Sequence, residues 1–177
     1  MNSTVKHFGR MLAVCGALSF AFGTAQANPQ SYPVKKPQFS GKVTSSINPK
    51  TGELKVCFKE IGLNYNKSVT YVAKAMVVAS YACRNNGGNC PKGQETAIKE
   101  NVSASATYSP DKSGTVSACI TLKVPKLSKN PCPGKMDLVL QSVSWSHITL
   151  ADVTNKVGPV DAHPSKQSAN FGVCPAK

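Results

Sequence analysis

Alternation of apolar and polar residues runs through much of the chain and predicts β-strands. It is clearest in two stretches, Val43–Lys59 and Ser103–Lys123. Each consists of two alternating segments around a turn that contains proline and ends in glycine, and each carries a cysteine five residues after that glycine. The cysteine, Cys57 or Cys119, lies opposite the apolar residues, because successive side chains of a strand point to opposite faces. These stretches predict two related β-hairpins.

Two further stretches predict the longest strands. In Val69–Arg84 one face is apolar throughout, and the other face starts polar but becomes apolar at Met76 and Val78. This pattern predicts a strand, or a strand pair with a bend, that passes into the interior of a sandwich, with a helix as the alternative. In Asp137–Thr154 the apolar positions change phase near Gln141, which indicates a β-bulge or a corner.

These patterns predict the fold class. We expect an all-β fold, an immunoglobulin-like antiparallel β-sandwich of about seven to nine strands, built from two pseudo-repeated halves and braced by disulfides. A single domain is predicted over residues 39–177. Prolines interrupt its final part, Lys156–Lys177, so we expect an irregular tail that Cys174 anchors.

The N-terminal residues predict export. Lys6 and Arg10 precede an apolar run, and small residues follow up to Ala27, which is the order of a signal peptide over residues 1–27. Residues 28–38 contain three prolines and predict an extended segment before the domain. We expect a secreted protein, extracellular or periplasmic, without a transmembrane segment.

The cysteine count predicts disulfides. Of seven cysteines, one lies in the predicted signal peptide, and the other six are Cys57, Cys83, Cys90, Cys119, Cys132 and Cys174. An even number in a small exported domain indicates three disulfides, with fifteen possible connectivities. We expect Cys83 to close locally on Cys90, and Cys174 to hold the tail. Zinc is the alternative, but there is no CxxC pair, and His147 and His163 have no ligand spacing, so neither a metal nor another cofactor is predicted.

The composition is strongly basic. The chain carries 21 lysines and arginines against 8 acids, a formal net charge of +13. Such a charge favours an anionic glycan or an anionic membrane surface as partner. Nucleic acid is not expected, because Arg84 is the only arginine outside the signal peptide and phosphate recognition relies largely on the bidentate guanidinium group. The lysines are scattered along the chain, so a dispersed positive surface without a partner is the alternative.

A loop and a strand carry the candidate ligand-binding residues. The loop Arg84–Gln94 combines asparagine, glycine and proline with two cations, and its candidate donors and acceptors are Arg84, Asn85, Asn86, Asn89 and Lys92. The alternative is a structural turn, in which asparagine side chains bond to their own backbone. We expect Trp145 and His147 to share a strand face, where they could stack on a sugar ring. The alternative is that Trp145 packs in the core.

The chain has no recognisable catalytic motif, and an enzyme is not predicted. Ser146 and His147 are neighbours, but in a regular strand they point to opposite faces and cannot form a dyad. A glycosidase needs two carboxyl groups that face each other, and Glu60 and Asp152, each at the end of a predicted strand, are the least implausible pair. P-loop, dinucleotide-binding, EF-hand and HExxH motifs are absent from the sequence.

Four short motifs resemble those of a known group of proteins: CFKEIGL (57–63), YACRNNGGNCP (81–91), CPGK (132–135) and SVSWSHITLADVTN (142–155). The chain resembles a group of small exported microbial β-proteins with CFxExGL and YxCxNxGGN motifs. The resemblance implies a secreted β-protein and no particular activity. Cys90 departs from that pattern, so the pairing of Cys83 stays open.

The sequence therefore predicts a secreted, non-enzymatic binding protein whose basic surface contacts an anionic glycan, a lipid head group or a cell surface. The alternative is a virulence or competition factor that binds a specific protein receptor of a host or competitor through Arg84–Lys92. A hydrolase with an unrecognised site is the third hypothesis.

Overall fold

The structure, a computed structural model, describes residues 36–174. The predicted signal peptide and most of the predicted extended segment lie outside the described residues. In the described part the regular elements are all β-strands, and none is a helix. In chain order they are β1 (Gln38–Phe39), β2 (Thr44–Ile47), β3 (Leu54–Ile61), β4 (Val69–Arg84), β5 (Glu95–Tyr108), β6 (Val116–Leu122), β7 (Asp137–Asp152), β8 (Val157–Asp161) and β9 (Lys166–Asn170).

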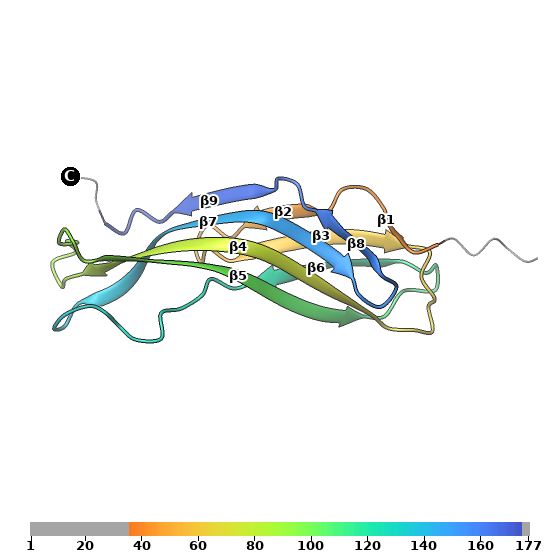
Figure 1. Ribbon diagram of the computed structural model, residues 1–177, viewed down its shortest axis with the longest axis horizontal. Helices are drawn as coiled ribbons and strands as arrows, with labels where there is room; N and C mark the ends of the chain where they lie inside the picture. The colour runs from red at the N-terminus through yellow and green to blue at the C-terminus, as the bar shows by residue number, and fades with distance from the viewer. Residues whose placement is uncertain (1–35, 175–177) are drawn as a thin grey trace, which may run out of the picture. The chain divides into compact units, whose positions relative to one another are not determined.

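The strands form two antiparallel sheets (Figure 1). In the β3 sheet, β6 pairs along one edge of β3, and β1 and β2 share its other edge. In the β4 sheet, β4 lies between β5 and β7, and β8 and β9 share the outer edge of β7. The predicted all-β sandwich is confirmed, while its immunoglobulin-like connectivity stays a prediction.

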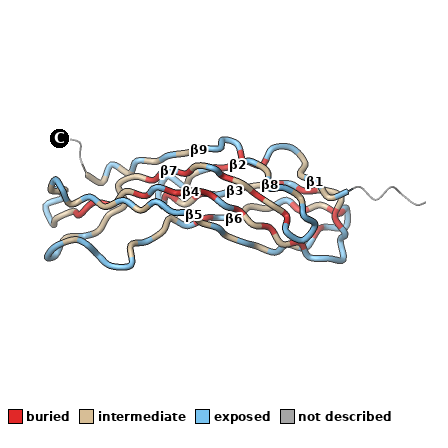
Figure 2. The backbone as a smooth tube through the Cα atoms, viewed as in Figure 1, coloured by how far each residue is buried: buried red, intermediate tan, exposed pale blue. Residues whose placement is uncertain are grey.

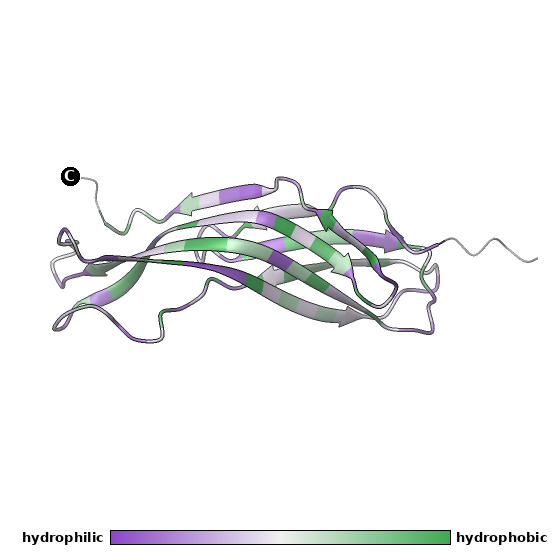
Figure 3. Ribbon diagram, viewed as in Figure 1, coloured by the Kyte–Doolittle hydropathy of each residue, from purple (hydrophilic) through white to green (hydrophobic). Residues whose placement is uncertain are grey.

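The core lies between the inner faces of the two sheets. Along β3 buried positions alternate with exposed or half-buried ones, and the same holds along most of β4. Figures 2 and 3 show buried and hydrophobic segments recurring along the central strands. The largest fully buried side chains include Trp145 and Tyr71 from the β4 sheet and Leu54 and Leu122 from the β3 sheet. The period of two in the sequence therefore places one apolar face of each sheet in the interior.

The strand predicted at Val69–Arg84 is confirmed as β4, a single strand of 16 residues. The helix alternative is wrong. The expectation that both faces become buried is wrong at Met76, which is half-buried, and at Val78, which is 36 % exposed, although Ala82 on the same face is buried near the end of the strand. The face of β4 that runs from Val69 through Tyr71 to Tyr81 packs in the core cluster.

The prediction of a second hairpin over Ser103–Lys123 is wrong. Its two strands belong to different sheets, since β5 pairs with β4 and β6 pairs with β3. Only the first stretch forms a hairpin, β2–β3. The pairing of β3 with β6 instead places Cys57 and Cys119, the matching cysteines of the two stretches, directly opposite each other, and a disulfide joins them.

The tail predicted as irregular contains two short strands, β8 and β9. Both pair only with β7, at the edge of the sheet. Pro159 lies within β8, and proline is tolerated on an edge strand because one row of its backbone donors needs no partner in the sheet. The prolines therefore mark a sheet edge in this part of the chain.

The phase change predicted in β7 near Gln141 is confirmed as a register shift. Ser80 pairs with Ser142 but Tyr81 pairs with Leu140, so Gln141 is an extra residue on β7. Its backbone carbonyl accepts a hydrogen bond from the N–H of Phe171, at 3.0 Å. The unpaired carbonyl is thus satisfied from the segment after β9.

All six cysteines predicted to pair do so. The disulfides are Cys57–Cys119, Cys83–Cys132 and Cys90–Cys174. The expected local link between Cys83 and Cys90 is wrong. Cys83 is a buried residue on the inner face of β4, so its side chain meets the connection between β6 and β7, whereas Cys90 lies in the loop beyond the strand. The expected anchoring of the tail through Cys174 is confirmed.

Candidate functional site

The two sheets differ in length at one end of the sandwich. β4 and β7 stay paired out to Arg84 and Asp137, whereas pairing between β3 and β6 ends at Leu54 and Leu122. The inner face of the longer sheet is therefore covered there by the β6–β7 connection, residues 123–136, rather than by strands. We call this region the braced end, because two of the three disulfides lie in it.

The disulfides hold three separate segments together at the braced end. Cys83–Cys132 ties the end of β4 to the β6–β7 connection, and Cys90–Cys174 ties the β4–β5 loop to the C-terminal segment. Figure 1 shows these three segments at the same end of the strands. Cross-links between distant parts of the chain restrict the loops that they join, so these loops are anchored at the same end of the sandwich.

The cations of the braced end come from two loops. Arg84 and Lys92 belong to the β4–β5 loop, and Lys129 and Lys135 to the β6–β7 connection, whose other two lysines, Lys123 and Lys126, line the larger groove described below. Lys92, Lys129 and Lys135 are exposed, and Arg84 is half-buried. Charges that are scattered in the sequence thus lie on loops that two disulfides anchor at one end of the sandwich.

The asparagines of the β4–β5 loop have different roles. The Asn85 side-chain oxygen accepts hydrogen bonds from the N–H groups of Gly87 and Asn89, at 3.1 and 2.9 Å, and Asn89 donates weakly to the Gly87 carbonyl, at 3.5 Å. The structural alternative therefore applies to Asn85 and Asn89, which shape the turn. Asn86 is exposed at the tip.

A shallow hollow combines residues of the two loops. It has a volume of about 390 Å³ and is lined by Asn85, Asn86, Gly87, Lys135 and Met136. An amide and an ammonium group that share a concave surface can bind the oxygens of a carboxylate, a sulfate or a phosphate. The sequence predicted Asn85 and Asn86 but not Lys135, which is 50 residues away along the chain and is brought there by Cys83–Cys132.

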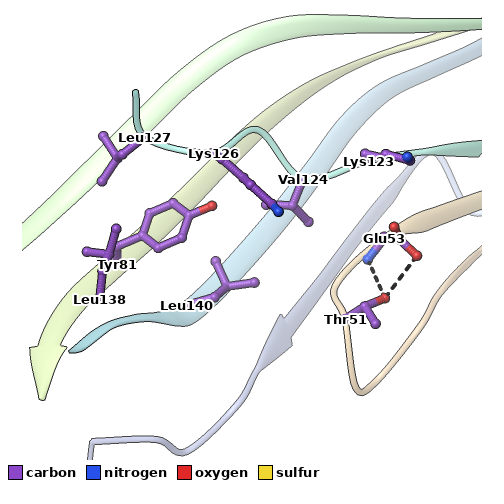
Figure 4. Close-up of a pocket in the computed structure, with 9 residues that line it drawn as sticks. All are labelled: Thr51, Glu53, Tyr81, Lys123, Val124, Lys126, Leu127, Leu138 and Leu140. Carbon is purple, nitrogen blue, oxygen red and sulfur yellow. Dashed lines mark hydrogen bonds between the residues drawn. The ribbon is translucent and has the colours of Figure 1, made fainter. Parts of the chain in front are cut away.

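A larger groove lies where the inner face of the longer sheet is incompletely covered. Its volume is about 700 Å³. The lining residues come from β4, β7, the β6–β7 connection and the β2–β3 turn; they are Thr51, Glu53, Tyr81, Lys123, Val124, Lys126, Leu127, Leu138 and Leu140 (Figure 4). Sequence reasoning missed this groove, because it results from the difference in length between two sheets that pack together.

The predicted pairing of Trp145 with His147 on one strand face is wrong. Trp145 is fully buried, and its indole N–H donates to the Gly52 carbonyl at 2.9 Å, so the core alternative applies. His147 is exposed and has a φ of 51°, because one residue of β4, Ala75, faces two residues of β7 at this point. This second bulge turns His147 outward. The sequence signal for it was the spacing of the inward apolar residues, which is three residues between Trp145 and Ile148 where a regular strand has two.

The bulge also corrects the expectation that Ser146 and His147 point to opposite faces. The His147 Nδ1 and Ser146 Oγ atoms are 3.3 Å apart. His147 lines a hollow of about 290 Å³ on the outer face of the β4 sheet, together with Lys74, Met76, Asn101 and Ser103 among others. No carboxylate is among the lining residues of this hollow, so the described residues there do not supply the third member of a catalytic triad.

The two acids that the sequence suggested as a pair do come together, but inside the core. Glu60 is fully buried and Asp152 is 1 % exposed. Tyr71, directly opposite Asp152 on β4, is fully buried beside them. Burial raises the pKa of Glu60 to about 7; the Tyr71 hydroxyl opposes that rise, and the Asp152 carboxylate adds to it.

The surroundings of this acid pair define what it can do. Asp152 is satisfied by the N–H groups of Thr154 and Asn155 and by the Asn155 side chain, at 2.8, 2.9 and 2.6 Å. Neither Glu60 oxygen, nor the Tyr71 hydroxyl, has a partner with good hydrogen-bond geometry. The groups influence one another's ionisation, but a substrate has no access to buried side chains. Burial therefore places this acid pair in the core and away from the surface that a substrate reaches.

The described residues show no group of three or more histidine, cysteine or acidic side chains that could hold a metal ion. Residues 36–174 also contain no helix that is long and apolar enough to cross a membrane. Comparison of the chain with protein-family models, with curated proteins and with solved structures found no match. The function is therefore argued from the geometry of the chain itself.

Proposed function

We propose that the protein is an exported, non-enzymatic binding protein that contacts an anionic glycan or anionic lipid head groups through its braced end. The observation that carries this proposal is the convergence of two loops, tied by disulfides, on a surface with one arginine and three lysines. Three intramolecular disulfides fit an oxidising compartment, and the predicted signal peptide fits export to it.

Binding at this site is electrostatic in origin. Two acids, Asp137 and Glu95, lie near the loops at the strand ends, so the four cations outnumber them. Exposed charges contribute about 0.5 kcal/mol each, so four of them together supply about 2 kcal/mol, or about thirtyfold in affinity. Screening by salt should reduce this contribution strongly.

The test compares two variants with the same change in net charge. In the braced-end variant, four cations of the two loops are replaced by glutamine: Arg84, Lys92, Lys129 and Lys135. In the sheet-face variant, four exposed lysines elsewhere are replaced by glutamine: Lys42, Lys55, Lys59 and Lys112. Affinity for polygalacturonate and for vesicles with or without phosphatidylglycerol is measured at low salt.

We expect the braced-end variant to lose about thirtyfold in affinity and the sheet-face variant to lose only a few-fold. Equal losses in the two variants would show that binding depends on net charge and not on this site. No binding of the wild-type protein to either polyanion at low salt would contradict the proposal altogether. The two probes separate a glycan partner from a lipid surface.

A specific protein receptor is the second candidate. The observation that favours it is the bracing of the β4–β5 loop by hydrogen bonds to the Asn85 side chain and by the Cys90–Cys174 disulfide. A pre-organised loop loses little conformational entropy on binding. Replacing Asn86 by alanine, which leaves the turn intact, should then abolish a protein contact without changing binding to polygalacturonate.

A further inference from the structure

The groove at the braced end has an apolar floor. Tyr81, Leu138 and Leu140 lie next to one another on β4 and β7, because Tyr81 pairs with Leu140 and Cys83 pairs with Leu138. Val124 and Leu127 face them from the β6–β7 connection (Figure 4). The leucines and Val124 are only partly buried, although they pack against the core cluster. These side chains therefore form an apolar surface that the described chain leaves partly open to solvent.

The polar groups of the groove are asymmetric in charge. Two lysines, Lys123 and Lys126, line it against one acid, Glu53. The Glu53 carboxylate already accepts a hydrogen bond from the Thr51 hydroxyl, at 3.2 Å. The Tyr81 hydroxyl donates to the Pro125 carbonyl at 2.5 Å, so it is used to hold the connection in place. The groove thus offers an apolar surface beside a net positive charge.

We propose that this groove binds the hydrocarbon chain of a fatty-acid anion, with the carboxylate at Lys123 and Lys126. The inference rests on the proposed function, because it names one class of anionic partner for the same end of the molecule. Figure 4 shows the Lys126 side chain extending across the hollow toward Val124. A volume of about 700 Å³ falls within the range of about 300–1,000 Å³ found for small-molecule sites.

The fluorescence of Trp145 can report whether a ligand occupies the groove. Trp145 is the only tryptophan of the chain, and its indole N–H is bonded to the carbonyl of Gly52. Gly52 lies between Thr51 and Glu53, which line the groove, and it is packed closely against Leu140. A chain that carries bromine and occupies the groove should therefore quench Trp145 fluorescence.

The experiment uses the exported chain and octanoate, decanoate and dodecanoate below their micelle concentrations, with 1-decanol as the neutral probe. Affinity is measured by calorimetry, and location by quenching with brominated dodecanoate. We expect each added CH2 group to raise affinity about two- to fourfold. Decanol should bind about fivefold more weakly than decanoate, because it lacks the charge that two lysines attract. Affinity that does not depend on chain length would overturn the proposal.

Variants separate the apolar and charged parts of the site. Leu138→Asn should weaken all three carboxylates and decanol by more than about tenfold. Replacing Lys123 and Lys126 by glutamine should weaken decanoate about fivefold and leave decanol unchanged. Glu53→Gln should strengthen decanoate about twofold. If Leu138→Asn fails to fold, Leu127→Asn in the connection tests the same apolar surface.

Val153→Asn, at a side chain that is 50 % exposed, and Lys112→Gln are the matched controls and should change nothing. Equal effects of Leu138→Asn and Val153→Asn would contradict the groove. Polygalacturonate binding separates the two proposals. If it persists while dodecanoate fails to bind, only the groove is wrong. If dodecanoate binds while neither polygalacturonate nor phosphatidylglycerol vesicles bind, only the anionic-surface function is wrong.

Discussion

The buried carboxyl group of Glu60 gives a sharp test of the fold, and Glu60→Gln is the perturbation. Glu60 lies on the inner face of β3, opposite the Tyr71 and Asp152 pair of the other sheet. The Phe58 and Tyr71 rings, with centroids 4.4 Å apart, help to exclude water from this end of the core. Glutamine has nearly the same shape as glutamic acid but cannot ionise, so the variant removes only the titration.

The sign of the effect follows from proton linkage. The pKa of Glu60 rises from 4.5 to about 7 on folding, so the folded chain keeps a proton that the unfolded chain releases as pH increases. The stabilisation is fully present below pH 4.5 and is lost as pH rises through 7. At about 1.36 kcal/mol per pKa unit, the loss amounts to roughly 3 kcal/mol. The Glu60→Gln variant should not show this loss of stability, because glutamine does not ionise.

Urea unfolding of both proteins under non-reducing conditions, at pH 4, 5.5, 7 and 8.5, measures this difference. Relative to the variant, the wild type should lose roughly 3 kcal/mol between pH 4 and pH 8.5. Using the difference between the two proteins cancels every pH-dependent contribution that they share. Glu100→Gln, at an exposed position of β5, is the matched control and should show no such dependence. A difference between wild type and Glu60→Gln that stays constant with pH would refute the reasoning.

Three further substitutions test other parts of the fold by thermal or urea unfolding. His147→Gly should raise the free energy of unfolding by about 1 kcal/mol and the melting temperature by about 3 °C, because glycine adopts a φ of 51° without strain. No gain in stability would mean that the bulge is not strained. Gly114→Ala should lower the free energy of unfolding by more than about 2 kcal/mol, because a Cβ there would collide with the Leu63 carbonyl. Gly41→Ala, which has space around it, should lower it by about 1 kcal/mol. Similar losses in the two variants would contradict the close packing at Gly114. Trp145→Phe should cost about 2–4 kcal/mol, since it leaves a cavity and an unpaired turn carbonyl, and a loss under 1 kcal/mol would argue against the buried hydrogen bond.

Much of the fold could be predicted because alternation is a local property. The strand Val69–Arg84 and the slip at Gln141 follow from which residues are apolar. Alternation does not say to which sheet a strand belongs, and Ser103–Lys123 therefore looked like a hairpin although its strands separate. The cysteine pairing was out of reach for the same reason, because it depends on how strands from distant parts of the chain are arranged.

The candidate site was only partly predictable. The loop with Asn85 and Asn86 was recognised from its composition, but the role of Asn85 depends on backbone geometry that composition does not reveal. Lys135 and the groove residues join the site only through the disulfides and the unequal sheets. His147 was placed on the wrong face because a bulge adds one residue to a strand, and the following positions then change face.

The central claim is that disulfides build the anion-binding surface, and removing one of them without changing the charge tests it most directly. In the first protein Cys83 and Cys132 are replaced by alanine, and in the control Cys57 and Cys119, whose disulfide lies on the outer face of the β3 sheet. Affinity for polygalacturonate at low salt should fall about tenfold in the first protein and stay unchanged in the control. Equal affinity in all three proteins would contradict the account.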